Sequence, residues 1–164
     1  MFGINCALFI LNKVLAEDFL VMSDINRKLH IKILHVEPNA NYREYIWEML
    51  SQQGYDVIGA EGIDSGLTKM MLHSPDILLI NNELPSESGL HMLKMICEDD
   101  IGPLAPFNNL PCVFLTDRMS VVDQSRAMRY GVEKVFTKPC SPSLLINYLN
   151  SIYGKSKVKV FEEE

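Results

Sequence analysis

Residues 75–85 read PDILLINNELP, and the four apolar residues at 77–80 decide the fold. They form an unbroken run rather than an alternation of apolar and polar residues, which is typical of a strand buried on both faces of a parallel sheet. Pro75 ends any helix that precedes the run, and the polar residues Asn81 and Asn82 follow it. The stretch therefore predicts a strand buried on both faces with a polar carboxyl end.

Outward from this strand, strand-like and helix-like segments alternate along residues 31–154. Apolar spacing, capping residues, and glycine or proline stops mark their boundaries. The predicted strands are 31–36, 55–60, 76–81, 112–116 and 132–137, and the predicted helices are 40–53, 64–73, 87–97, 120–130 and 141–153. Five such units with short connections predict an α/β fold, in which helices cover both faces of a parallel sheet.

Some local features carry more specific predictions. Asp64 is expected to cap the helix that follows it, and Met71 is expected to face inward beside Met70. Residues 98–111 contain three prolines and one glycine. They are longer than most connections, so we expect a surface loop there. Gly154 is expected to end the last helix.

The two ends of the chain differ from the domain between them. Residues 1–30 are predicted to be an extension, and two interpretations stay open: an amphipathic helix, or translation that begins at Met22. The apolar face of such a helix would consist of Leu8, Leu11, Leu15, Phe19 and Met22. Residues 155–164 are predicted to be a charged tail without fixed structure.

Composition argues against several classes of function. The formal net charge is −6, and residues 31–154 carry all of it, with nine basic and fifteen acidic side chains. Nucleic-acid binding needs a basic face, so we expect no nucleic-acid partner. No apolar run reaches membrane-spanning length, and the four cysteines lack zinc-type spacing. We therefore expect a cytoplasmic protein with reduced thiols, no membrane contact and no metal. His35, inside a predicted strand, is expected to be packed rather than to act as a ligand.

Chemistry in a sheet of this kind lies at the carboxyl ends of the strands. Glu37 and Pro38 follow the first predicted strand, and Asn81 ends the third. Thr116 ends the fourth strand, and Lys138 follows the fifth. In this order and at these places, the residues resemble the receiver domain of two-component response regulators.

The resemblance covers about residues 31–154 and implies a flavodoxin-like (βα)5 three-layer sandwich with strand order 2-1-3-4-5. It also implies a role in phosphorelay signalling. In that family an aspartate at the end of the third strand accepts a phosphoryl group. Two acidic residues after the first strand help it to hold magnesium, and a threonine or serine and a lysine contact the phosphoryl oxygens.

The departures from the family pattern decide the expected function. Asn81 stands at the acceptor position, Glu37 and Pro38 stand at the two acidic positions, and Thr116 and Lys138 match. A neutral carboxamide has no anionic oxygen to attack phosphorus. Pro38 offers no side-chain oxygen to magnesium, which prefers carboxylates. We predict a degenerate phosphoacceptor pocket, near neutral without a metal or cofactor, in which Lys138 reaches Glu37 or the Asn81 amide oxygen.

The position of the family's switch residue is also altered. In the family an aromatic residue three positions before the lysine moves together with the threonine or serine. That position here is Val135, whose β-branched side chain is stiff and too short for such a swing. Phe136 is adjacent, but neighbouring residues of a strand face opposite ways. Asp117 stands where the family has a small residue, and it adds acidity near the entrance.

One surface is predicted to contact partners. In this family the usual partner or dimer face combines the helix at 120–130, the strand at 132–137 and the helix at 141–153. Its candidate contact residues are Arg126, Arg129, Glu133 and Lys134. A solvated surface is the alternative interpretation. Trp47 lies off the apolar face of its helix, so it either contacts a partner or packs against the N-terminal extension.

The sequence therefore predicts an atypical receiver domain that is not an enzyme. It would regulate by contact with a signalling protein or with a second copy of itself, independently of phosphorylation. One alternative is a phosphoaccepting receiver that uses Glu83 or Asp117 while Glu37 holds a metal. Another is a flavodoxin-like nucleotide-binding enzyme, although residues 38–40 supply no glycine-rich phosphate loop.

Overall fold

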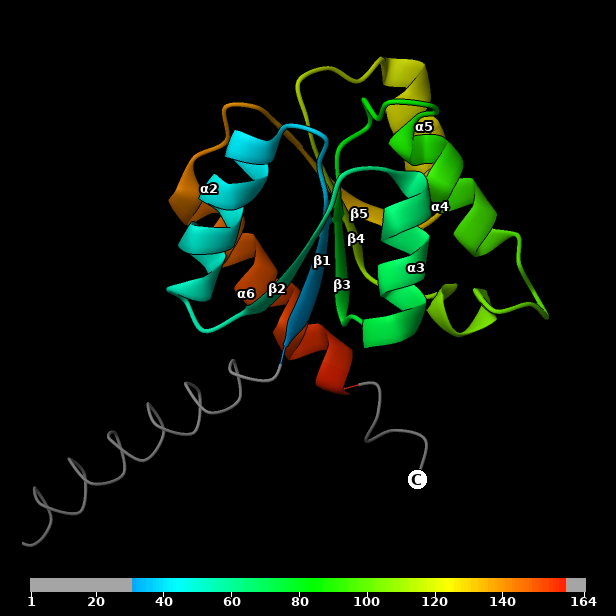
Figure 1. Ribbon diagram of the computed structural model, residues 1–164, viewed down its shortest axis with the longest axis horizontal. Helices are drawn as coiled ribbons and strands as arrows, with labels where there is room; N and C mark the ends of the chain where they lie inside the picture. The colour runs from blue at the N-terminus through cyan, green and yellow to red at the C-terminus, as the bar shows by residue number, and fades with distance from the viewer. Residues whose placement is uncertain (1–30, 159–164) are drawn as a thin grey trace, which may run out of the picture.

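The computed structural model describes residues 31–158, in which a layer of parallel strands lies between two layers of helices (Figure 1). The expectations for residues 1–30, and for the chain beyond residue 158, lie outside the described residues. The sheet has five strands in the order β2-β1-β3-β4-β5. All neighbouring strands pair in parallel, so the predicted fold class and strand order are confirmed.

The strands lie close to their predicted positions. They are β1 (Lys32–Val36), β2 (Asp56–Ala60), β3 (Ile77–Ile80), β4 (Cys112–Thr116) and β5 (Val132–Thr137). All four residues of β3 are buried, as the apolar run predicted. β3 is the central strand because it pairs with β1 on one side and with β4 on the other.

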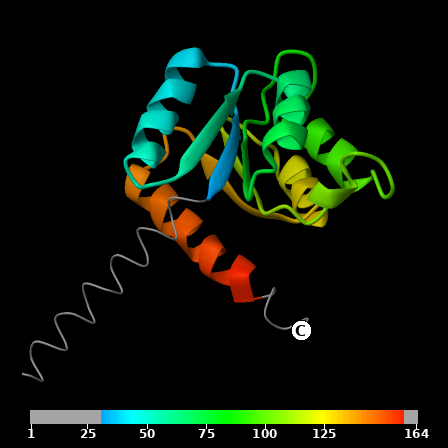
Figure 2. The same ribbon diagram turned by 60° about the horizontal axis from the view of Figure 1, so that its bottom comes forward.

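The helices divide between the two faces of the sheet. They are α2 (Ala40–Ser51), α3 (Ile63–His73), α4 (Gly89–Cys97), α5 (Val121–Arg129) and α6 (Pro142–Val158), with a 3-10 turn η1 (Ala105–Phe107). α2 and α6 cover one face, and α3, α4 and α5 cover the other (Figures 1 and 2). Successive residues of β3 point to opposite faces of the sheet. Leu78 and Ile80 enter the core under α3, α4 and α5, and Ile77 and Leu79 enter the core under α2 and α6. Within residues 31–158, none of the helices has the length and apolar character needed to cross a membrane.

Two predictions for α3 are wrong. The helix begins one residue before Asp64, with Gly62 as its N-cap, so Asp64 lies in the first turn. The Ser65 hydroxyl accepts a hydrogen bond from the Gly62 amide at 3.3 Å. The amide of the N-cap residue is therefore satisfied without the Asp64 side chain. Met71 is 47% exposed, whereas its neighbour Met70 faces the sheet and is fully buried.

Two further expectations also need correction. α6 continues through Gly154 to Val158. A glycine inside a helix costs only about 1 kcal/mol relative to alanine, which is too little to end a helix by itself. The connection at 98–111 is not only a surface loop, because η1 and the residue before it place Phe107 and Leu104 in the core of the α3–α4–α5 face.

Candidate functional site

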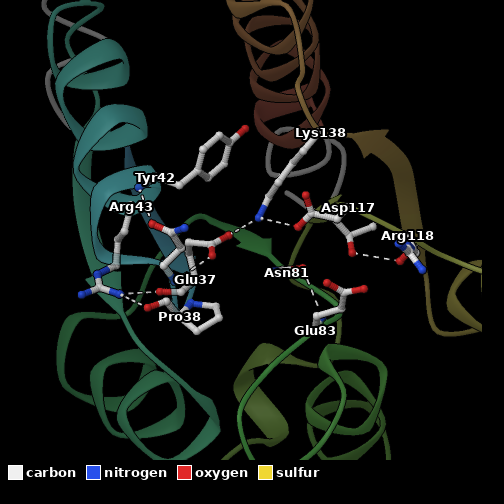
Figure 3. A network of polar contacts seen from close by, with 11 residues as sticks. Glu37, Pro38, Tyr42, Arg43, Asn81, Glu83, Asp117, Arg118 and Lys138 are labelled. Carbon is white, nitrogen blue, oxygen red and sulfur yellow. Dashed lines mark hydrogen bonds and ion pairs between the residues drawn. The ribbon is translucent and has the colours of Figure 1, made fainter.

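The strand register brings the predicted site residues to one edge of the sheet. Glu37, Asn81 and Lys138 each follow directly after a strand end, and Thr116 is the last residue of β4. Backbone hydrogen bonds hold these ends together, with the Asn81 amide donating to Val36 at 2.9 Å and the Lys138 amide donating to Thr116 at 3.0 Å. We call Glu37, Pro38, Asn81, Thr116 and Lys138 the strand-end site (Figure 3).

Glu37 is the buried acid of the site, with 1% of its surface exposed. Its Oε1 accepts a hydrogen bond from the Asn39 amide at 2.9 Å. Its Oε2 forms an ion pair with the Lys138 ammonium, and the Lys138 side chain is only 8% exposed. Both carboxylate oxygens therefore already have partners, and the prediction that Lys138 reaches Glu37 is confirmed.

Asn81 takes no part in this ion pair. It is 3% exposed, and its Oδ1 accepts a hydrogen bond from the Glu83 amide at 3.1 Å. The amide oxygen thus closes a local turn after β3 instead of meeting Lys138 (Figure 3). Gly89, at the start of α4, packs against the same segment: a Cβ added there would lie 2.3 Å from the Asn81 carbonyl oxygen.

Lys138 has two further neighbours that complete its surroundings. Its Nζ lies 3.6 Å from Asp117 Oδ2 and 4.5 Å from the centre of the Tyr42 ring. An ammonium over an aromatic face is attracted by the negative face of the ring. Asp117 lies near the entrance as expected, whereas Tyr42 is a site residue that sequence reasoning missed. The Asn39 side chain caps α2 by accepting a hydrogen bond from the Tyr42 amide at 3.1 Å, which fixes the first turn of the helix beside Glu37.

Arg43 is a second residue that sequence reasoning missed. Its guanidinium donates to the Glu37 carbonyl oxygen and, at 3.4 Å, to the Pro38 carbonyl oxygen (Figure 3). Gly59 of β2 leaves room for this side chain, because a Cβ there would lie 3.0 Å from Arg43 Cδ. α2 thus holds the turn that carries Glu37 and Pro38.

Thr116 is fully buried and serves the loop after β4. Its hydroxyl donates to the Arg118 carbonyl oxygen at 3.0 Å, across the intervening Asp117. Asp117 itself remains 57% exposed at its side chain. The loop after β4 therefore starts at the buried, hydrogen-bonded Thr116, and the carboxylate of the next residue, Asp117, lies at the surface.

The donor set does not fit the magnesium ion that the family pattern implies. Magnesium binds through carboxylates in near-octahedral geometry. Here both Glu37 oxygens have partners, Pro38 has no side-chain oxygen, and the Asn81 oxygen accepts from a backbone amide. In the part of the chain that the structure describes, no three His, Cys, Asp or Glu side chains form a group that could hold a metal ion. The arrangement fits an internal ion-paired network instead.

His35 lies in β1, two residues before Glu37, and is completely buried. Neither of its ring nitrogens has a hydrogen-bond partner among the described residues. Burial, with the nearby charges of Lys138 and Arg43, lowers its pKa to about 3. The expectation that His35 is a packed residue is confirmed, and it is a neutral imidazole beside the ion pair.

Comparison with known proteins identifies the family. A family model for the response regulator receiver domain matches residues 33–150. The chain belongs to this family. The phosphate regulon transcriptional regulatory protein PhoB of Klebsiella pneumoniae is 30% identical over 132 residues, covering 80% of this chain and 56% of that protein. The sensory transduction protein BceR of Halalkalibacterium halodurans is 27% identical over 121 residues, covering 74% of this chain and 49% of that protein. The chain thus spans about half the length of the curated relatives it matches.

Solved receiver domains share the fold. A CheY-like response regulator receiver domain protein from Methanospirillum hungatei has a TM-score of 0.69 at 19% identity, covering 79% of this chain and 98% of that chain. The non-phosphorylated HemR receiver domain of Leptospira biflexa has a TM-score of 0.66 at 23% identity, covering 75% of this chain and 94% of that chain. By the family model, residues 33–150 are a response regulator receiver domain of two-component signalling, and the strand-end site lies at the carboxyl ends of its strands.

The two faces of β5 divide as predicted in this receiver domain. Val135 packs toward the α3–α4–α5 core, and Phe136 packs toward the α2–α6 core. On that second side the Phe136 ring meets Tyr148 edge to face, with ring centres 5.6 Å apart. Phe136 thus cannot substitute for an aromatic residue at position 135.

The candidate contact residues do not all lie on one surface of the receiver domain. Arg126 and Arg129 on α5, and Glu133 and Lys134 on β5, are exposed. Arg126 lies 3.5 Å from Asp123 of its own helix. Trp47 is 49% exposed on α2, which covers the opposite face of the sheet from α5 (Figures 1 and 2). Trp47 therefore lies on the other side of the sheet from Arg126 and Arg129.

Proposed function

We propose that this receiver domain works without an acyl phosphate, as a regulatory domain that binds other proteins. The observation that carries the proposal is the strand-end site, in which Asn81 replaces an acid and both Glu37 oxygens already have partners. A carboxamide oxygen is not an anionic nucleophile. The buried charge of Glu37 is balanced by Lys138 from within the chain, so the site is complete without phosphate or magnesium.

The proposal assigns recognition rather than catalysis to the domain. Its expected contact surface is the α5–β5–α6 face, where Arg126, Arg129, Glu133 and Lys134 are exposed. A signalling protein or a second copy of the chain would bind there, while the net charge of −6 argues against direct nucleic-acid contact. A cytoplasmic location remains part of this proposal.

A phosphorylation assay tests the proposal directly. The full chain is incubated with magnesium and a small phosphoryl donor, and its intact mass is measured. We expect no added phosphoryl group, because the carboxylates near Lys138 are engaged in ion pairs or stand outside the acceptor position. A receiver domain with an aspartate at the end of its third strand, treated in the same way, shows that the donor is active.

A covalent phosphoryl adduct on the unmodified chain would overturn the proposal. Peptide mapping of that adduct to Glu83 or Asp117 would favour the alternative of a phosphoacceptor with a non-standard carboxylate. An adduct that Glu83→Gln and Asp117→Asn variants both retain would point to an acceptor elsewhere in the chain.

A further inference from the structure

α5 is held on the sheet less firmly than its neighbour α4. Of the nine residues of α5, only Ala127 is buried. Val121, Val122 and Met128 are 79%, 60% and 56% exposed. α4 has the same length, but it buries Gly89, Met92, Leu93 and Ile96. The position of α5 must therefore depend strongly on contacts at its two ends.

Contacts at the C-terminal end of α5 reach α4. The Tyr130 hydroxyl donates to Glu98 at 3.3 Å, and the Cys97 thiol donates to the Tyr130 carbonyl oxygen at 3.5 Å. At the N-terminal end, Ser120 caps the helix, and Thr116 bonds the preceding loop at Arg118. These N-terminal bonds shape the loop itself. The Asp117 carboxylate adds a side-chain contact from this loop to the ammonium of Lys138, which follows the neighbouring strand β5.

The Asp117–Lys138 contact is asymmetric. Lys138 is 8% exposed and is fixed by Glu37 from β1 and by the Tyr42 ring from α2. An ammonium removed from water attracts a carboxylate more strongly than one in bulk solvent does. The Asp117 side chain is 57% exposed, so it loses little hydration on approaching Lys138. The pair thus has a buried, firmly held cation and a partly hydrated anion.

We infer that Asp117 is a positioning residue that tethers the β4–α5 loop to Lys138 and so fixes the start of α5. The tether supplies from within the chain a second anion for the buried ammonium. It holds the exposed apolar residues Val121 and Val122 in one place for a partner. This inference rests on the proposed function only for the role of the α5 face, since the tether itself is a property of the isolated chain.

Hydrogen–deuterium exchange on the full chain tests the tether. Asp117→Asn keeps the size of the side chain and removes its charge. We expect exchange in peptides from the loop and α5, residues 117–129, to rise by about two- to five-fold, the range expected for losing a partly exposed ion pair. Peptides from β1 and β3 should exchange as before, and Asp117→Glu should restore slow exchange in part.

Glu83→Gln is the matched control, because Glu83 is an exposed acid near the same site that has no ion pair with Lys138. It should leave exchange in α5 unchanged. Salt provides a second readout: raising the ionic strength to about 1 M screens exposed pairs. It should speed exchange in the unmodified chain more than in Asp117→Asn, which, among the described residues of α5, keeps only the Arg126–Asp123 pair for salt to screen.

Equal exchange in the unmodified chain and Asp117→Asn would overturn the tether, as would an equal effect of Glu83→Gln. Either result would leave the proposed function intact, because that proposal depends on the absence of a phosphoryl adduct. An adduct on the unmodified chain would overturn the proposed function without changing the exchange result.

Discussion

The centre of the sheet and its β5 edge are built in opposite ways. Every residue of β3 is buried between two neighbouring strands and two layers of helices. β5 pairs on one side only, and Val132 is its one buried residue. The centre is therefore fixed by packing on all sides, whereas the edge strand leaves Glu133 and Lys134 exposed. Lys138 joins the two regions, because it follows β5 in the chain and pairs with Glu37 at the end of β1.

The strongest test of this link is the replacement of Lys138 by alanine. The variant leaves Glu37, which is 1% exposed, without its counter-charge. Breaking a buried ion pair from one side typically costs about 3–5 kcal/mol of unfolding free energy. Urea unfolding at neutral pH measures this loss.

A double variant separates the lost ion pair from lost packing. Glu37→Gln combined with Lys138→Met removes both charges and keeps most of the volume, so it should regain most of the stability lost by Lys138→Ala. If Lys138→Ala unfolds at the same urea concentration as the unmodified chain, the edge and the centre are not coupled through this pair.

The next prediction concerns the unfolding free energy of the chain at acid pH, which depends on His35 in β1. Burial, then Lys138 and Arg43, lower the pKa of His35 from 6.5 to about 3 in the folded state. Between these two values the unfolded chain binds a proton that the folded chain does not, so acid favours unfolding. The stability is complete above pH 6.5 and falls as the pH decreases toward 3. The expected loss from His35 between pH 7 and pH 5 is about 2 kcal/mol.

The variant His35→Leu isolates this contribution. It removes the titrating group and two buried nitrogens that lack hydrogen-bond partners. Urea unfolding at several pH values should therefore show a smaller acid-dependent loss for the variant than for the unmodified chain. Curves that run parallel from pH 7 to pH 5 would contradict the low folded-state pKa.

The centre of the fold was more predictable from sequence than the surroundings of the site. The apolar run at 77–80 is typical of a strand buried on both faces, which is what β3 is, and the family resemblance implied the place of this strand in the sheet. The motif residues at the strand ends were also found, because parallel strands bring their carboxyl ends to one edge. The need to balance a buried charge predicted that Lys138 reaches Glu37 or the Asn81 amide oxygen, and the structure shows Glu37 as its partner.

The missed features depend on distances between helices and strands, which no local pattern contains. Tyr42 could be assigned to the inner side of its helix, but its contact with Lys138 depends on the Lys138 side chain reaching from the end of β5 toward α2. Arg43 meets the turn after β1 because Gly59 on another strand leaves space. Met71 was wrongly expected to face inward, since helical spacing alone does not separate a flank from the buried side of a helix.

The smallest expected effect is that of Val121→Ala, which is compared with the same substitution in the centre of the sheet. Val113 in β4 is fully buried, and Val121 on α5 is 79% exposed. Val113→Ala should cost roughly 2–3 kcal/mol of unfolding free energy, from lost apolar burial and the cavity left behind. Val121→Ala should change it by no more than about 0.5 kcal/mol. Urea unfolding of both variants, repeated over a range of protein concentrations, sharpens the comparison. Val121→Ala could instead lower the unfolding free energy as much as Val113→Ala, with a larger loss at high protein concentration. The α5 face would then be buried against a second copy in solution, and the edge would be as packed as the centre.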